Sequence, residues 1–206
     1  RSIMRTSTTK YAELHCHSNF SFLDGASHPE ELAKEAAHLG LNALALTDRN
    51  GLYGVVRFAE AASLLHIPTV IGSELTLADS NDHVVVLARN QQGYARLSRA
   101  ISKGQMKGKK GLPRFELDDL AEQHHDDWLL LTGGPNGLTP NALREYGANY
   151  AQRQLLELSD RFGADNVAVE IWSHGDPIDT DRNDQLVEIA EQAKVSVVAT
   201  NAVHYA

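Results

Sequence analysis

The sequence predicts an α/β fold, a distorted parallel barrel of the (βα)7, TIM-like type with seven strands. Apolar segments of strand length alternate with amphipathic segments of helix length, which is typical of a parallel sheet with crossover helices. Polar residues stand at the ends of several strands, as in barrels whose strand ends share one face. An open doubly wound sheet also fits the alternation. However, no G-x-G-x-x-G sequence follows the first strand, and an open sheet uses mainly one crevice.

The composition is that of one globular domain. The chain has 206 residues, enough for one sizeable core, with 42% hydrophobic and 22% charged residues. The net charge of -8 counts against a domain built mainly to grip a nucleic-acid backbone, although a local basic groove remains compatible with it. The single cysteine, Cys16, excludes an internal disulfide and suits a reducing compartment, and no apolar run is long enough to span a membrane. We therefore expect a cytoplasmic protein.

The first predicted strand begins at Tyr11 and runs into a loop. His15 and His17 are two residues apart, so both side chains point to one side of a strand, while Cys16 faces the other side as a small buried residue. Two imidazoles followed by the acid Asp24 make half of a metal site. The other interpretation is a polar strand end with two solvated histidines. Residues 1–10 precede the strand as an N-terminal extension or a cloning scar, and the barrel is expected over 11–206.

The remaining elements follow from turn signals and periodicity. Ser27 and Glu30 form a capping-box pattern around Pro29 at the start of the first helix, and Gly40 ends that helix. Further strands are expected at 41–50, 69–77, 83–90, 127–134, 167–174 and 195–205, and helices at 29–39, 52–65, 93–103, 116–125, 140–146, 150–162 and 181–193. The chain has no residues left for a helix over the last strand, so we expect an exposed apolar strip near 195–199.

Potential metal ligands stand at or near the ends of several of these strands. The set comprises His15, His17, Asp48, Glu74, His174 and His204, with Arg49 beside Asp48. His83 is the exception, because it lies at the start of the fourth predicted strand.

Residues 103–114, KGQMKGKKGLPR, are rich in glycine and lysine. One interpretation is a mobile solvated loop. The other is a contact of Lys107, Lys109 and Lys110 with nucleic-acid phosphates.

The order of these residues resembles the PHP domain, named for polymerase and histidinol phosphatase. The resemblance rests on His15-x-His17, Asp24, Thr47-Asp48, Gly72-Ser73-Glu74, His83, His174 and Val203-His204. The segments FSFLDGASHPEEL, LTDRNGLYGVVRFAEAA and VVATNAVHYA are more narrowly similar to the N-terminal PHP domain of bacterial C-family polymerases, in the error-prone alpha-subunit branch used in damage-induced synthesis. The resemblance covers nearly the whole chain. It implies a fragment of a longer polymerase, whose own Mg-dependent site lies elsewhere, with DNA, the remaining polymerase domains and accessory subunits as partners.

The resemblance also implies up to three metal ions at the barrel mouth. By this likeness His15, His17 and Glu74 hold a first ion, and Glu74 bridges to a second that His83 and His174 complete. Asp24 and His204 belong to a third. Neighbouring ions of this kind would lower the pKa of a bound water and bind phosphate oxygens.

Two positions depart from the family pattern. Arg49 stands where the family has histidine, and Ala202 where it has aspartate. Neither side chain can bind a metal. We therefore expect an eroded site with one divalent ion, Zn or Mn, at Glu74, His83 and His174, or with none. Our hypothesis is that Arg49 replaces a metal by pairing with Asp24 and approaching Glu74.

The expected function is that of a largely structural PHP domain in an error-prone, damage-induced DNA polymerase that acts in DNA replication and repair. In that case nucleotidyl transfer belongs to other domains of the parent enzyme, and the fragment itself has little or no catalytic activity. The alternative is an active metal-dependent phosphoesterase, either a 3′-5′ proofreading exonuclease or a free-standing phosphatase. A pure nucleic-acid-binding module would rest on the basic segment alone and conflicts with the net charge.

Overall fold

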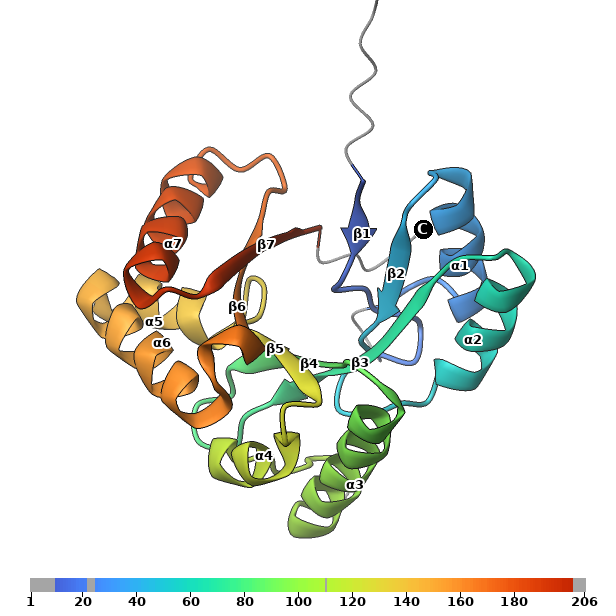
Figure 1. The fold of residues 1–206 in the computed structure, drawn as a ribbon, viewed down its shortest axis with the longest axis horizontal. Helices are drawn as coiled ribbons and strands as arrows, with labels where there is room; N and C mark the ends of the chain where they lie inside the picture. The colour runs from blue at the N-terminus through green and yellow to red at the C-terminus, as the bar shows by residue number, and fades with distance from the viewer. Residues whose placement is uncertain (1–9, 22–24, 110, 202–206) are drawn as a thin grey trace, which may run out of the picture.

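The computed structural model describes residues 10–21, 25–109 and 111–201. Within these ranges strands and helices mostly alternate, although β4 follows β3 directly and two pairs of helices are consecutive. The helices lie outside a ring of strands (Figure 1). The strands are β1 (Ala12–Glu13), β2 (Ala43–Leu46), β3 (Thr69–Thr76), β4 (His83–Ala88), β5 (Trp128–Leu131), β6 (Val167–Trp172) and β7 (Ser196–Thr200). The helices are α1 (Pro29–His38), α2 (Val55–Leu64), α3 (Gln91–Lys107), α4 (Leu117–His124), α5 (Leu138–Tyr146), α6 (Ala148–Phe162) and α7 (Asp179–Ala193), with a 3-10 turn at Ala164–Asn166.

The sheet follows chain order, from β1 to β7. Four neighbouring pairs are parallel, but β4 runs antiparallel to both β3 and β5, so the predicted all-parallel sheet is wrong at this strand. The reason is chain length, because the link from β3 to β4 covers only residues 77–82 and a parallel crossover needs a dozen or more. The reversal brings His83 beside Thr76, near the end of β3 that carries Glu74.

The ring of strands is nearly closed. Within the described residues, β7 and β1 form no ladder with each other. Instead, the backbone N–H of Asn201, just after β7, donates to Oε2 of Glu13 in β1 over 2.9 Å. A side chain therefore bridges the seam between the first and last strands.

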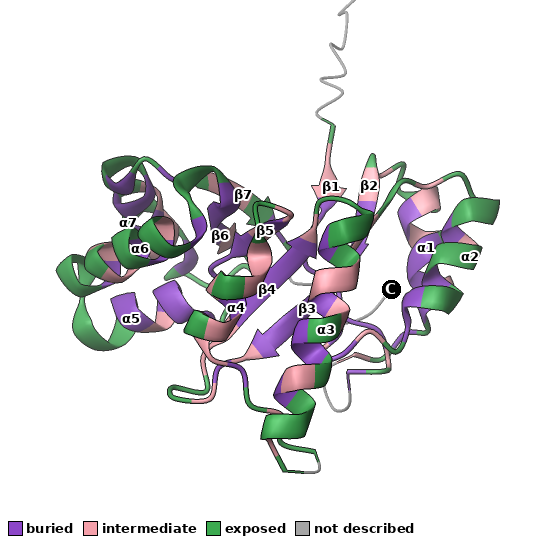
Figure 2. Ribbon diagram, turned by 60° about the horizontal axis from the view of Figure 1, so that its bottom comes forward, coloured by how far each residue is buried: buried purple, intermediate pink, exposed green. Residues whose placement is uncertain are grey.

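Apolar side chains pack on both sides of the strands. A small interior cluster contains Ala45, Val85, Leu87, Leu131 and Ala168. Two outer clusters fill the space under the helices, one beneath α1 and α2 and a larger one beneath α3 to α7. Figure 2 shows this layering, since the strands β3 and β4 are buried and the outward surfaces of the helices are exposed. Among the described helices none has the length and apolarity needed to cross a membrane.

Two local predictions about helices need correction. The first turn of α1 is closed one residue later than expected, because the N–H of His28 donates to Oε2 of Glu31 over 2.7 Å. Glu30 instead pairs with Arg57 of α2. Helix α3 was predicted to end near Lys103 but continues to Lys107. Gly104 does not end the helix but lets the Phe115 ring pack directly against it. A Cβ at position 104 would lie only 2.4 Å from that ring.

The last strand is less exposed than predicted. Val195 is buried, and Val197 and Val198 are half-buried against the outer and inner clusters respectively. The expected exposed apolar strip is reduced to Ala199, because helix α7 packs against β7.

Candidate metal centre

One carboxylate, that of Glu74 at the end of β3, is surrounded by four side-chain nitrogens. Its Oε2 lies 2.9 Å from Nε2 of His15 and 3.5 Å from Nε2 of His17. Its Oε1 lies 3.1 Å from Nδ1 of His83 and accepts a hydrogen bond of 3.1 Å from Nε of Arg49. The two oxygens thus face different partners, two histidines on one side and a histidine with an arginine on the other.

His15 and His17 lie on the same side of the chain, as their spacing predicts. Their ring centroids are 5.2 Å apart, and a ligand atom of each lies within 4.8 Å of the other and of Glu74. Both side chains are buried, so the interpretation as solvated strand-end histidines is wrong. Cys16 faces the opposite way into the apolar cluster under α1 and α2, as expected.

Glu170 of β6 also belongs to the site, although the sequence analysis missed it. Its side chain is fully buried, with Oε1 2.7 Å from Nδ1 of His15 and 2.5 Å from the donating hydroxyl of Thr200. The available signal was an acid inside the otherwise apolar strand VAVEIW. A carboxylate on the second nitrogen of a metal-binding histidine fixes its tautomer and ring orientation.

The buried charges shift each other's protonation. Burial opposes the charged form of His15, but Glu170 and then Glu74 outweigh it and raise the pKa of His15 to about 10. Burial likewise opposes the charged form of Glu74, yet the three histidines His15, His17 and His83 keep its pKa well below the ordinary value. Any metal would therefore compete with a proton at His15.

The residues after β2 aim Arg49 at this carboxylate. Asp48 is buried and accepts hydrogen bonds from the backbone N–H of Ser18 (2.7 Å) and from the hydroxyls of Ser18 and Ser21 (2.8 Å each). The Ser21 hydroxyl in turn accepts the backbone N–H of Arg49 over 3.0 Å. Asp48 therefore orders the loop after β1 and places Arg49 opposite Glu74.

The predicted approach of Arg49 to Glu74 is confirmed by the 3.1 Å contact. The guanidinium is not deeply buried, since the side chain keeps 32% of its exposure. Asp24, the other acid that Arg49 was expected to pair with, lies outside the described residues, as do Ala202 and His204.

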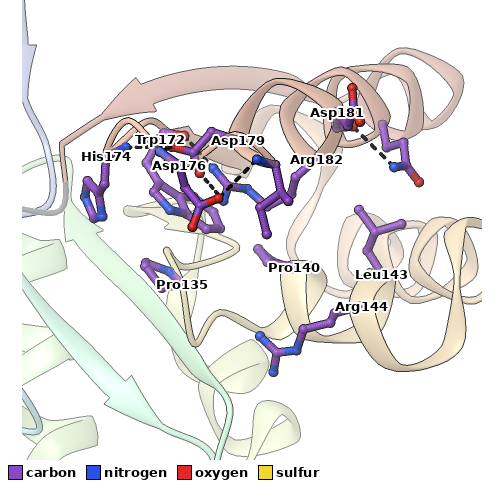
Figure 3. Close-up of a pocket in the computed structure, with 12 residues that line it drawn as sticks. Pro135, Pro140, Leu143, Arg144, Trp172, His174, Asp176, Asp179, Asp181 and Arg182 are labelled. Carbon is purple, nitrogen blue, oxygen red and sulfur yellow. Dashed lines mark hydrogen bonds and ion pairs between the residues drawn. The ribbon is translucent and has the colours of Figure 1, made fainter.

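His174 is brought to a different place. Its exposed ring has Nε2 2.9 Å from the carbonyl oxygen of Asn201, and it lines a surface pocket of about 520 Å³ near Trp172 and Pro135 (Figure 3). The described ligand atoms that gather within 4.8 Å are those of His15, His17 and Glu74. The structure thus gathers the trio expected for the first ion, His15, His17 and Glu74. It does not gather Glu74, His83 and His174, where a single remaining ion was expected.

The three lysines of the basic segment also separate. Lys107 is the last residue of α3 and forms an ion pair with Asp119 of α4. Lys109 is exposed just after the helix, and Lys110 lies outside the described residues.

The gathered trio fits one divalent ion. Two imidazoles and a carboxylate are a donor set used for zinc and related transition metals, and Glu170 supplies the outer partner that such a histidine usually has. The fit is limited to the Oε2 side of Glu74, because Oε1 already receives the fixed positive charge of Arg49.

The fold and this cluster define a class of protein. The family model described as "PHP domain" matches residues 13–174, so this chain belongs to the PHP domain family. Among its relatives, a protein from Mycolicibacterium paratuberculosis named "Error-prone DNA polymerase" is 49% identical over 97% of this chain. Proteins of the same name from Mycobacterium tuberculosis and Cutibacterium acnes are 48% and 47% identical over 97% and 95% of the chain. The chain spans about a fifth of the length of these relatives, 18–19% in each case.

Solved structures agree on the fold. A protein from Bifidobacterium adolescentis classed as a metal-dependent phosphoesterase superposes with a TM-score of 0.66 at 15% identity, over 95% of this chain and 88% of that one. An amidohydrolase from Chromobacterium violaceum gives 0.68 at 17% identity, over 94% and 87%. At these identities the similarity establishes the barrel architecture alone.

Proposed function

We propose that this chain is the PHP domain of an error-prone DNA polymerase, where it serves mainly as a scaffold with reduced capacity for metals. The polymerase assignment is supported by relatives of that name at 47–49% identity over nearly the whole chain. DNA and the remaining polymerase domains are then its partners in the parent protein, which would work in the bacterial cytoplasm.

The single observation behind the reduced metal capacity is the contact of Arg49 with Glu74. A divalent ion on Oε1 of Glu74 would stand next to this guanidinium. Two like unit charges about 4 Å apart repel by roughly 4 kcal/mol at the effective dielectric of a protein site. Arg49 also neutralises a buried acid that would be costly to leave without a cation.

A second function, a metal-dependent phosphoesterase, is favoured by a different observation. His15, His17 and Glu74 gather their ligand atoms within 4.8 Å, and Glu170 supports His15 from behind. One ion bound there would supply Lewis acidity and a bound water of lowered pKa. The chain's own residues would orient that ion through His15 and Glu170 and limit it to one side of Glu74.

Metal stoichiometry separates the two functions. The full-length protein, purified without chelator, would be loaded with Mn or Zn and measured by elemental analysis, both as the natural chain and with Arg49→His. Arg57→His is the matched control, because Arg57 pairs with the outlying acid Glu30. Beyond the ions of the polymerase site elsewhere in the parent protein, we expect zero or one ion for the natural chain and for the control, and more for Arg49→His. Two or three such additional ions in the natural chain, accompanied by hydrolysis of a 3′ phosphodiester, would overturn the scaffold proposal.

A further inference from the structure

A cleft of about 430 Å³ opens beside Arg49, and it shares no lining residue with the surface pocket that His174 lines. Three segments contribute to it: the loop after β1, the loop between β2 and α2, and the end of α3 with the residues that follow. The lining residues are Phe20, Ser21, Arg49, Asn50, Tyr53, Gln105, Lys109, Gly111 and Pro113.

The charge of the cleft is opposite to that of the chain. Among the described residues its lining includes two cations, Arg49 and Lys109, and no acid, although the whole chain carries a net charge of -8. Lys103 and Lys107 both pair with Asp119. Lys109 forms no ion pair with any residue in the described part of the chain, so its ammonium is available to an anion in the cleft.

Two large aromatic side chains stand exposed at the same cleft. Tyr53 keeps 64% of its exposure and Phe20 keeps 38%, which is unusual for rings of this size. The Tyr53 ring is held in place from two sides. It lies over Gly51, where a Cβ would come within 2.3 Å of the ring, and its hydroxyl accepts a hydrogen bond of 3.0 Å from Nε2 of Gln105. The aromatic surface is therefore presented to solvent in a fixed position.

Positioned aromatic rings beside cations are the features by which proteins bind single-stranded nucleic acid, because bases stack on the rings while the cations meet the phosphates. We propose that this cleft binds a single-stranded DNA segment, with a phosphate between Lys109 and Arg49 and a base stacked on Tyr53. The role goes beyond the scaffold function and needs no metal. It also narrows the interpretation of the basic segment, since Lys109 and not Lys107 faces the ligand.

Photo-crosslinking in the full-length protein tests this proposal. The substitution Tyr53→p-benzoylphenylalanine would place the crosslinker in the cleft, and Tyr146→p-benzoylphenylalanine is the control, because Tyr146 is similarly exposed, at 65%, on α5. The probe is a labelled oligothymidylate of about 20 nucleotides. EDTA is present throughout, so the result does not depend on metal binding and can fail separately from the scaffold proposal.

We expect crosslinking from position 53 but little from position 146. Adding Lys109→Gln should lower the yield from position 53 about fivefold or more at 100 mM salt, because one phosphate contact is lost. Lys34→Gln, at an exposed lysine on α1, should leave the yield unchanged. Equal yields from positions 53 and 146, or a yield from position 53 that does not respond to Lys109→Gln, would overturn the proposal. A circular dichroism spectrum identical to that of the natural chain ensures that a lost signal is not lost folding.

Discussion

The contact between Arg49 and Glu74 makes a quantitative prediction about stability. If Arg49 occupies the place of a cation, Arg49→His should make the protein less stable without metal and more stable with it. Histidine removes the permanent charge beside Oε1 of Glu74 and offers a metal ligand in its place. The order of the two proteins on a stability scale should therefore reverse between EDTA and saturating metal.

The structure sets the expected size of both changes in stability, the loss in EDTA and the gain with metal. Breaking a buried ion pair costs about 3–5 kcal/mol. Arg49 keeps 32% of its side-chain exposure and three histidines remain around Glu74, so solvent screening reduces the expected loss in EDTA to about 1 kcal/mol. With metal at about 100 times its dissociation constant, binding adds roughly 2.7 kcal/mol. For a domain of this size that gain corresponds to a rise in Tm of about 5–10 °C.

Thermal unfolding of the natural chain, Arg49→His and the control Arg57→His would be followed in EDTA and across a manganese titration. Arg49→His should gain more stability from metal than the natural chain or the control, and its curve should cross that of the natural chain. Equal metal-induced shifts in the natural chain and in Arg49→His would refute the view that Arg49 stands in for a cation.

Three further predictions concern the rest of the molecule. Glu170→Gln should weaken metal binding by about 10–100-fold in a competitive chelator titration, because His15 loses its buried carboxylate partner. Glu191→Gln, at an exposed position, should leave the metal affinity unchanged. Equal metal affinities of the two variants would show that Glu170 is not part of the site. On α2, Phe58→Ala should lower the free energy of unfolding, measured by urea denaturation, by about 3–5 kcal/mol, because Phe58 is fully buried. Leu64→Ala, at an exposed position of the same helix, should lower it by no more than about 0.5 kcal/mol. Similar losses for the two variants would contradict the assigned packing. The pKa of Asp179 is lowered, because burial, which raises it, is outweighed by the N–H of His174 and by Arg182. Its charge therefore stabilises the fold above the ordinary pKa of 3.8, and this contribution is lost as the pH falls through the lowered value. Asp179→Asn should therefore make the urea midpoint fall less steeply as the pH is lowered below about 4. Identical pH dependences of the urea midpoint in the natural chain and in Asp179→Asn would refute this role of Asp179.

The barrel could be predicted from the sequence because apolar strands and amphipathic helices leave strong local patterns. The reversal of β4 was missed although its cause is also local, since the link at residues 77–82 has no room for a crossover helix. The short link implies an antiparallel β4, whose first residue, His83, then lies at the same end of the barrel as Glu74. The boundary of α3 was missed for a tertiary reason, because Gly104 looks like a helix breaker until the Phe115 ring is seen to need the space.

The site was predictable where motif order carries the information, at His15, His17 and Glu74. Glu170 could not be placed, because its partner His15 lies 155 residues away in the chain and a lone acid in an apolar strand does not name its partner. The position of His174 depends on the turn that follows β6. In that turn the backbone N–H of His174 donates to the Asp179 carboxylate over 2.8 Å. The His174 ring then contacts the carbonyl oxygen of Asn201 and not Glu74.

The seam between β1 and β7 gives this cluster a mechanical role. His15 follows the first strand, whereas Glu170 and Thr200 belong to the sixth and seventh strands, and the ladder that would otherwise join the two edges is absent from the described part of the sheet. The buried pair of His15 and Glu170 therefore links the two ends of the sheet, and it can form only when these ends lie close together. A centre with few or no metals would still keep the ring shut, and hydrogen exchange in the first strand would report how firmly it does so.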